Sequence, residues 1–264
     1  MSDDPTRFTT ADWWDAYWDG TPLPQRIGHE TSTYVDQLLT VLDRYLPDGG
    51  ASVLEIGGAP GRYLSYLHDR GMTVTALEYS PVGVELTKEN FRRLGIPATV
   101  VHGDMFDRGL EIEPQDAVYS LGLIEHFDDP VAVARAHVRL VKPGGILIIG
   151  APNLQGVSKW LHGRLSPSVL ETHHWPATVP ENWDAYEREL GLERLYRGYI
   201  GGFEPAVFGR LESDALVDRA LWWGLRLLRK PFDHPRARRL RSYNSPRWSG
   251  YLIAAYRVPG PGAE

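Results

Sequence analysis

The chain of 264 residues has no cysteine and no long apolar run. Without cysteine it can form neither a disulfide framework nor a thiolate nucleophile. No apolar stretch approaches the roughly 20 residues of a membrane-spanning helix, and residues 1–4 lack the basic and apolar regions of a signal peptide. We therefore expect no transmembrane segment and a single globular domain, residues 1–264, located in the cytoplasm.

Positive charge is outnumbered, because 34 acidic residues face 28 basic ones and the net charge is −6. Lysine is scarce, since it accounts for only four of the basic residues. A general nucleic-acid binder needs clustered Lys and Arg, so we expect no DNA partner. The preference for arginine indicates a GC-rich genome. One stretch, residues 226–247, is strongly basic and contains Asp233 as its only acid. A solvated surface is its first interpretation, and a site for RNA, phosphate or anionic lipid is the alternative.

A glycine-rich turn follows the first buried strand. Val53–Ile56 is apolar enough for a central strand, and Gly57-Gly58-Ala59-Pro60-Gly61 comes directly after it. Glycines let the backbone approach a ligand, and Glu78, at the end of the next apolar run, can accept hydrogen bonds from both ribose hydroxyls. This pattern predicts a site for a nucleoside cofactor. An NAD-dependent oxidoreductase is disfavoured, because Arg62 stands where Gly-x-Gly-x-x-Gly needs its final glycine.

Three further landmarks follow in order. Gly103-Asp104-Met105-Phe106 comes after a third apolar segment, so that an acid and a thioether could meet an adenine amino group and ring. A fourth strand, from Asp116, leads into a loop that ends at Phe127. Residues 140–145 then turn into a fifth strand, Ile146–Gly150. This succession, over residues 50–155, resembles the class I S-adenosylmethionine-dependent methyltransferases, and specifically the small-molecule branch that includes ubiquinone-biosynthesis O-methyltransferases.

The resemblance implies an α/β fold with a doubly wound, mostly parallel, seven-stranded sheet. It implies S-adenosylmethionine as cofactor and transfer of its methyl group to an oxygen or nitrogen of a small metabolite. The GC-rich signature in addition favours natural-product biosynthesis as the setting. The cofactor residues expected from it are Glu55, Gly57, Gly58, Gly61, Arg62, Glu78, Tyr79, Asp104, Met105 and Leu121. Ala59 replaces the middle glycine of the family motif, which costs little if its φ is negative.

Three parts make up the expected domain. They are a helical cap (1–47), a cofactor-binding core (50–153) and a substrate-side segment with a helical insertion and the last strands (154–264). Helical periodicity and turn signals predict helices over 12–18, 34–45, 62–70, 81–94 and 131–141. The last strands are expected over 196–200 and 251–258, and the resemblance makes them antiparallel. The long segment between them, 203–246, should form helices that cap the substrate pocket or a subunit interface.

Histidines are the candidates for proton transfer to or from a methyl acceptor. His126 follows the fourth strand, and His173 with His174 lies in the segment expected above the pocket; fixing or solvating a loop is the alternative role for each. Trp14 and Trp18 of the cap, together with His126 and His174, are the expected substrate contacts. At least two of the three cap tryptophans are expected to pack against the core.

No metal site is expected. Some ubiquinone-pathway relatives hold a divalent metal with acids around the position of Glu125 and His126. Here Gly122 stands where a third ligand would be, and two ligands alone make a weak site. The remaining alternative is an RNA- or membrane-directed cofactor-binding protein that uses residues 226–247. The sequence leaves the acceptor unidentified and the oligomeric state open, and a homo-oligomer is compatible with it.

Overall fold

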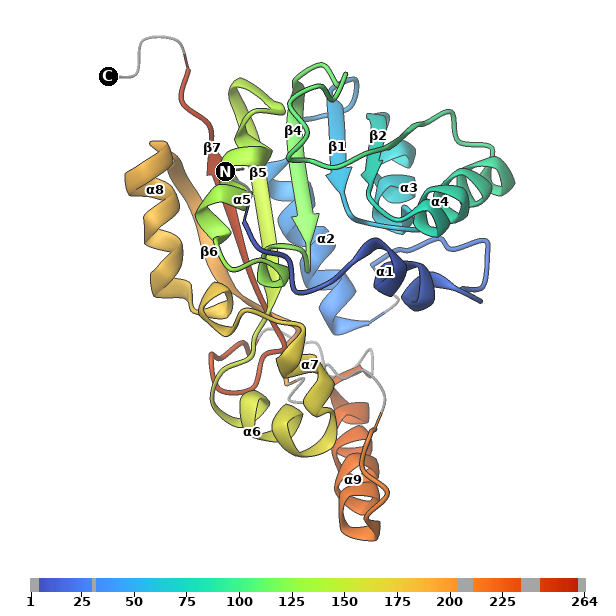
Figure 1. The fold of residues 1–264 in the computed structure, drawn as a ribbon, viewed down its shortest axis with the longest axis vertical. Helices are drawn as coiled ribbons and strands as arrows, with labels where there is room; N and C mark the ends of the chain where they lie inside the picture. The colour runs from blue at the N-terminus through green and yellow to red at the C-terminus, as the bar shows by residue number, and fades with distance from the viewer. Residues whose placement is uncertain (1–4, 30–31, 204–210, 234–242, 261–264) are drawn as a thin grey trace.

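The computed structural model describes residues 5–29, 32–203, 211–233 and 243–260, which form a seven-stranded sheet with helices on both faces (Figure 1). The strand order is β3-β2-β1-β4-β5-β7-β6. The strands are β1 (Ser52–Ile56), β2 (Thr73–Glu78), β3 (Thr99–His102), β4 (Gln115–Leu121), β5 (Val141–Pro152), β6 (Glu193–Ile200) and β7 (Tyr251–Arg257). The predicted α/β fold is confirmed.

Strands β1 to β5 pair in parallel, whereas β7 runs antiparallel to both β5 and β6. The antiparallel pairing of the last two strands is therefore confirmed. Because β1 lies between β2 and β4, the order of strand addition reverses at β1. Open α/β sheets bind ligands at such a switch point, beyond the carboxyl ends of the strands.

The sheet is buried on both faces. Val53 and Leu54 are both fully buried but belong to different core clusters, since successive side chains of a strand point to opposite faces. Helices α2 (Thr33–Tyr45), α3 (Arg62–Asp69) and α4 (Pro81–Leu94) contribute to one cluster. Helices α5 (Pro130–Val138) and α8 (Asp184–Leu190) contribute to the other.

Helix α4 has the predicted bounds because both of its ends carry local signals. Ser80 caps the helix by accepting a hydrogen bond from the Gly83 N–H at 2.9 Å, and Pro81 occupies the first turn. Gly95 ends the helix with a φ of 69°.

Residues 141–145 correct two predictions. The predicted helix over 131–141 ends at Val138, and the predicted turn over 140–145 is largely part of β5. Val141 pairs with Gln115, and the register then shifts so that Ile146 pairs with Ala117. The pairs with β4 thus lie on either side of residues 142–145, and the strand continues past a bulge in which Gly144 has a φ of 78°.

The predicted cap helix is confirmed as α1 (Ala11–Trp18), which lies beyond the arrowheads of β1 and β4 (Figure 1). None of its side chains is buried. The expectation that at least two of its tryptophans pack against the core is therefore wrong. Trp14 and Trp18 instead stack on each other, with ring centroids 6.3 Å apart.

A short 3-10 helix, η1 (Ile124–His126), follows β4 in the core. The carboxyl-terminal part contains the helices α6 (Gly156–Leu165), α7 (Pro167–Glu171) and α9 (Leu216–Asp233). Two more 3-10 helices, η2 (Trp175–Thr178) and η3 (Pro180–Trp183), precede α8. Helix α9 confirms that the insertion is helical. It packs on α6, where the Arg164 Nε lies 2.5 Å from the Asp218 Oδ1, and it extends away from the sheet (Figure 1). Its predicted role as a pocket or interface cap stays a prediction.

Residues 234–242 of the basic stretch, which include Arg236, Arg238, Arg239 and Arg241, lie outside the described residues. Within the residues that the structure describes, no helix is long and apolar enough to cross a membrane.

Candidate active site

The expected cofactor residues gather at one edge of the sheet. The glycine turn follows β1, Glu78 ends β2, Asp104 follows β3 and Leu121 ends β4. These four strands are neighbours and parallel, so their carboxyl ends share this edge. The tertiary structure thus brings together positions that the sequence separates by more than 60 residues.

The glycine turn is closely packed on an acid beneath it. A Cβ on Gly58 would lie 2.0 Å from the Glu55 side chain, and one on Gly61 would lie 2.6 Å from the Phe91 ring. Gly57 and Gly61 also have φ values of 70° and 77°, which favour glycine. Among the described residues only glycines have positive φ, so Ala59 is accommodated as expected.

Glu55 is an unusual buried acid. It is 1% exposed, and its Oε2 has no hydrogen-bond partner. Burial raises the pKa of Glu55 to about 8, although Tyr119 and the charge of Arg62 act in the opposite direction. The unpartnered Oε2, next to the glycine turn, could receive a donor group from a cofactor.

Glu78 joins the glycine turn to the start of α4. Its Oε2 accepts a hydrogen bond from the Ala59 N–H at 3.3 Å, and its Oε1 accepts from the N–H groups of Tyr79 and Ser80 at 3.0 and 3.1 Å. Burial raises the pKa of Glu78, and these three bonds oppose the shift. A carboxylate has about four acceptor positions. Glu78 therefore has room for one further donor, and binding both ribose hydroxyls requires one backbone bond to be given up.

Asp104 is engaged by a residue that the sequence analysis did not single out. Its Oδ1 accepts from the Phe106 N–H at 3.0 Å, and its Oδ2 forms an ion pair with Arg7. Met105, expected to cover an adenine ring, is 4% exposed and belongs to a core cluster. Its contact with a cofactor stays a prediction.

The remaining cofactor candidates line the same edge less tightly. Tyr79 and Leu121 are half-buried, and the Tyr79 ring carries the Arg7 guanidinium at 4.5 Å. Arg62 is exposed at the start of α3, with its guanidinium 5.0 Å from the Tyr63 ring. Their roles toward a cofactor stay predictions.

His126 is buried in η1, and its tautomer follows from its partner. Its Nδ1 lies 2.8 Å from the carbonyl oxygen of Thr172, which can only accept, so Nδ1 carries the proton. The Nε2 therefore has a free lone pair, and it lies 4.0 Å from the Glu125 Oε1. Burial, and secondarily the neighbouring His173, lowers the pKa of His126 to about 3. The imidazole is neutral at physiological pH and is a weak base.

The two adjacent histidines, His173 and His174, contact different residues. The His173 ring lies 4.6 Å from the His126 ring, whereas the His174 ring stacks on Phe8 at 5.9 Å. Burial lowers the pKa of His173 to about 4, so this ring is also neutral. Only His173 joins His126 directly.

Glu125 and His126, the two possible ligands considered in the sequence, gain a third member that the sequence analysis did not recognise, His173. Ligand atoms of Glu125, His126 and His173 all lie within 4.8 Å of one another. The Glu125 Oε2 is buried without a partner, and burial raises the pKa of Glu125 to about 8. Two imidazole nitrogens and one carboxylate suit a divalent transition metal. His173 thus comes from a distant segment to the place where Gly122 offers no ligand, and the expected absence of a metal stays a prediction.

An aromatic group from α1 covers the His126 side of the site. The Trp14 ring meets the His126 ring edge-on at 5.0 Å, and the Trp13 ring lies at 6.3 Å. Trp14 is also held by Thr9, whose Oγ1 accepts from its Nε1 at 3.1 Å. Trp14 therefore contacts His126 directly, while Trp18 is one ring further away, and the contact of either tryptophan with an acceptor stays a prediction.

Known proteins are similar to this chain in the part that carries the cofactor residues. A model of the methyltransferase domain family matches residues 54–149. The ubiquinone biosynthesis O-methyltransferase of Xanthomonas axonopodis pv. citri (strain 306) is 30% identical over 190 residues, which cover 69% of this chain and 75% of that protein.

Two solved structures are similar in fold. The cyclase SpnF has a TM-score of 0.62 and 17% identity, covering 98% of both chains. The geranyl diphosphate C-methyltransferase from Streptomyces coelicolor A3(2), solved with S-adenosyl-L-homocysteine, has a TM-score of 0.55 and 16% identity, covering 85% of this chain and 76% of that one.

Proposed function

The chain belongs to the class I S-adenosylmethionine-dependent methyltransferases, and on this premise we propose that it methylates an oxygen atom of a small, flat metabolite. The enzyme class and a small-molecule acceptor follow from the family. The choice of oxygen is supported by relatives named O-methyltransferases and by the neutral His126. The comparisons support neither an NAD-dependent oxidoreductase nor an RNA- or membrane-directed binder.

The observation that carries the proposal is the convergence of the glycine turn, Glu78 and Asp104 at one sheet edge. S-adenosylmethionine supplies an electrophilic methyl group on a sulfonium. Two features support its fit to this site: the unpartnered Glu55 Oε2 beside the turn, and the close contact at Gly58 that any Cβ would obstruct. We assign the turn and Glu55 to the methionine part, Glu78 to the ribose and Asp104 to the adenine.

Methyl transfer depends chiefly on position, because the cofactor already carries its leaving group. Holding a nucleophile in line at near-contact distance can contribute roughly 7–11 kcal/mol. We assign that positioning to the wall formed by Trp14 and His126, whose rings lie 5.0 Å apart. The same aromatic rings exclude water and favour a flat acceptor.

His126 is the residue to which we assign the acceptor proton. Its Nε2 lone pair can accept a hydrogen bond from a hydroxyl, because Nδ1 is committed to Thr172. Its low pKa makes full deprotonation of a free alcohol unfavourable. An acidic hydroxyl, such as a phenol, is therefore the acceptor class that this histidine serves best.

Calorimetric titration with S-adenosylhomocysteine, with NADH in parallel, tests the proposal. We expect binding of S-adenosylhomocysteine alone, followed by methyl uptake on phenols in preference to amines or sugars. Binding of NADH alone would overturn the assignment, and uptake confined to amines would overturn the choice of oxygen. Cytoplasmic location stays a prediction from the sequence, and the oligomeric state stays open.

A further inference from the structure

The amino-terminal segment, residues 5–18, crosses the sheet edge that holds the cofactor residues. Its Arg7 Nη2 donates to the Asp104 Oδ2. The guanidinium carbon also lies over three rings, 4.5 Å from Tyr79, 5.2 Å from Phe127 and 5.3 Å from Phe106. A planar cation thus combines an ion pair with aromatic stacking at one position.

Backbone hydrogen bonds hold this part of the segment in register. Arg7 forms an antiparallel bridge with Phe127, and the Phe8 N–H donates to the His126 carbonyl at 2.9 Å. The Thr6 N–H donates to the Asp128 Oδ1 at 2.7 Å, and the Asp128 N–H donates to the Thr6 carbonyl at 3.1 Å. Arg7 is therefore placed by the fold and is not an arbitrary surface rotamer.

Helix α1 continues the contact along the same edge. The Asp15 Oδ1 accepts from the Ser80 hydroxyl at 2.5 Å and from the Val82 N–H at 3.1 Å, at the start of α4. On its other side α1 presents Trp14 to His126. One segment therefore contacts both the proposed cofactor residues and the proposed acceptor site.

Arg7 and an adenine would need the same groups. Both oxygens of Asp104 already accept a hydrogen bond, one from Phe106 and one from Arg7. The Tyr79 ring, which follows the ribose acid Glu78, is stacked by the guanidinium. A guanidinium and an aminopurine edge are both planar N–H donors, so each can pair with a carboxylate while it lies on an aromatic ring.

Building on the proposed function, we propose that Arg7 is an internal occupant of the adenine subsite, which the cofactor displaces when it binds. Displacement breaks the Arg7–Asp104 ion pair and releases residues 6–8 from residues 126–128. Since α1 follows directly, its aromatic rings move away from His126 in the same event, which opens the acceptor site, and they return to His126 once the acceptor is bound. Cofactor binding would then precede acceptor binding.

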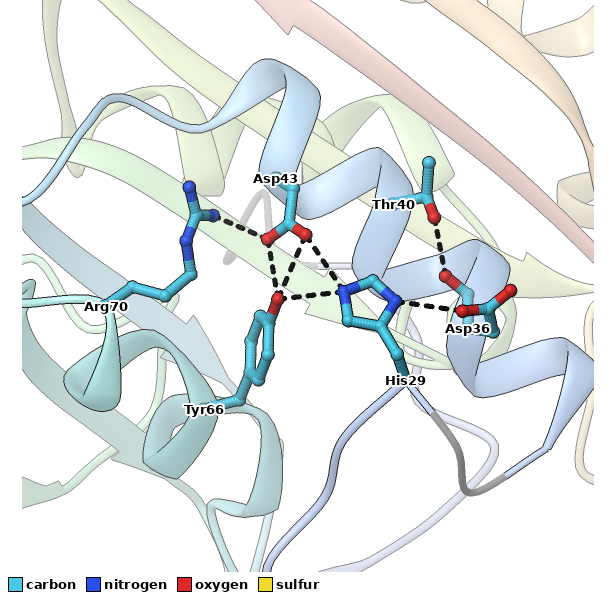
Figure 2. A network of polar contacts seen from close by, with 6 residues as sticks. All are labelled: His29, Asp36, Thr40, Asp43, Tyr66 and Arg70. Atoms are coloured by element: carbon cyan, nitrogen blue, oxygen red, sulfur yellow. Dashed lines mark hydrogen bonds and ion pairs between the residues drawn. The ribbon is translucent and has the colours of Figure 1, made fainter.

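Residues 25–29, which follow the amino-terminal segment, are anchored separately, so they limit how far that segment can move. The Gln25 N–H donates to the Asn90 Oδ1 at 2.7 Å. Figure 2 shows that His29 joins α2 and α3, with its Nδ1 2.9 Å from the Asp36 Oδ1 and its Nε2 3.0 Å from the Tyr66 hydroxyl. Gly20, with a φ of 70°, lies between the two parts and is a suitable hinge.

Titration of the full chain with S-adenosylhomocysteine tests this occupancy, because the proposal predicts that removal of the Arg7 side chain increases the affinity. We expect Arg7→Ala to bind about tenfold more tightly than the parent, equivalent to about 1.4 kcal/mol, because the competitor is removed. Arg26→Ala is the matched control, since Arg26 also forms an ion pair but lies in the anchored part and pairs with Asp69, and it should bind like the parent. Weaker or unchanged binding by folded Arg7→Ala would overturn the inference.

Hydrogen exchange supplies a second readout. Added S-adenosylhomocysteine should accelerate exchange at the Phe8 and Asp128 amides, which bond across the bridge, and slowed exchange there would overturn the displacement. Failure of the proposed function itself is distinguishable. If neither the parent nor Arg7→Ala binds, both proposals are wrong, whereas binding by Arg7→Ala alone supports the occupancy.

Discussion

Replacing Glu55 by glutamine tests the physical consequence of burying an acid beneath the glycine turn. Burial raises the pKa of Glu55 to about 8 from the 4.5 of an exposed glutamate. Between these two values the folded protein holds a proton that the unfolded chain releases. Stability should therefore fall as pH rises, by about 1.4 kcal/mol per pH unit, or about 4 kcal/mol between pH 5 and pH 8.

Glutamine keeps the size of the side chain, including its contact with Gly58, but cannot ionise. The Glu55→Gln variant should therefore not show the loss of stability with rising pH that Glu55 causes. With about 2–4 °C per kcal/mol for a chain of this size, the melting temperatures should diverge by about 8–16 °C at pH 8 and by little at pH 5.

Thermal unfolding from pH 5 to pH 8 measures the effect, with the exposed Glu111→Gln as control. The control should follow the parent at every pH. Parallel decline of the parent and Glu55→Gln would refute the reasoning, because it would mean that Glu55 is already ionised in the folded protein.

Three further predictions concern the site. Glu78→Ala should weaken S-adenosylhomocysteine binding at least tenfold and also lower the melting temperature, because three backbone N–H groups lose their acceptor. Asp104→Ala should also weaken binding but should lower the melting temperature less, because only one backbone N–H group, that of Phe106, loses its acceptor. Unchanged affinity in both folded variants would discard the cofactor assignment. His126→Ala should lower turnover at least tenfold and change cofactor affinity less than twofold, and equal turnover would leave His126 a structural residue. Activity should survive chelation by EDTA; a loss that Zn²⁺ or Mn²⁺ restores would instead assign the Glu125–His126–His173 cluster to a metal.

The sequence by itself determined the sheet and the edge where the cofactor residues lie. Val53–Ile56 and its glycine turn, and the limits of α4 between Ser80 and Gly95, are encoded by neighbouring residues. Periodicity, capping and turn chemistry act over a few residues, so they can be read without the fold. The strand ends then meet because parallel strands place their carboxyl ends together.

Local patterns failed where contacts between distant segments outweigh them. Residues 142–145 favour a turn by composition, yet the pairs of Val141 and Ile146 with β4 keep them within one strand as a bulge. The tryptophans of α1 are apolar enough for a core, but α1 lies over the sheet edge and its aromatic rings stack among themselves.

Only the tertiary structure decided how the site is occupied and charged. Arg7 reaches Asp104 across 97 residues, and His173 reaches His126 across the whole of α5 and β5. The raised pKa values of Glu55 and Glu125 likewise come from desolvation, which no single segment produces. Ion pairing, ring stacking and loss of water all depend on distance through space, and the order of residues along the chain does not specify that distance.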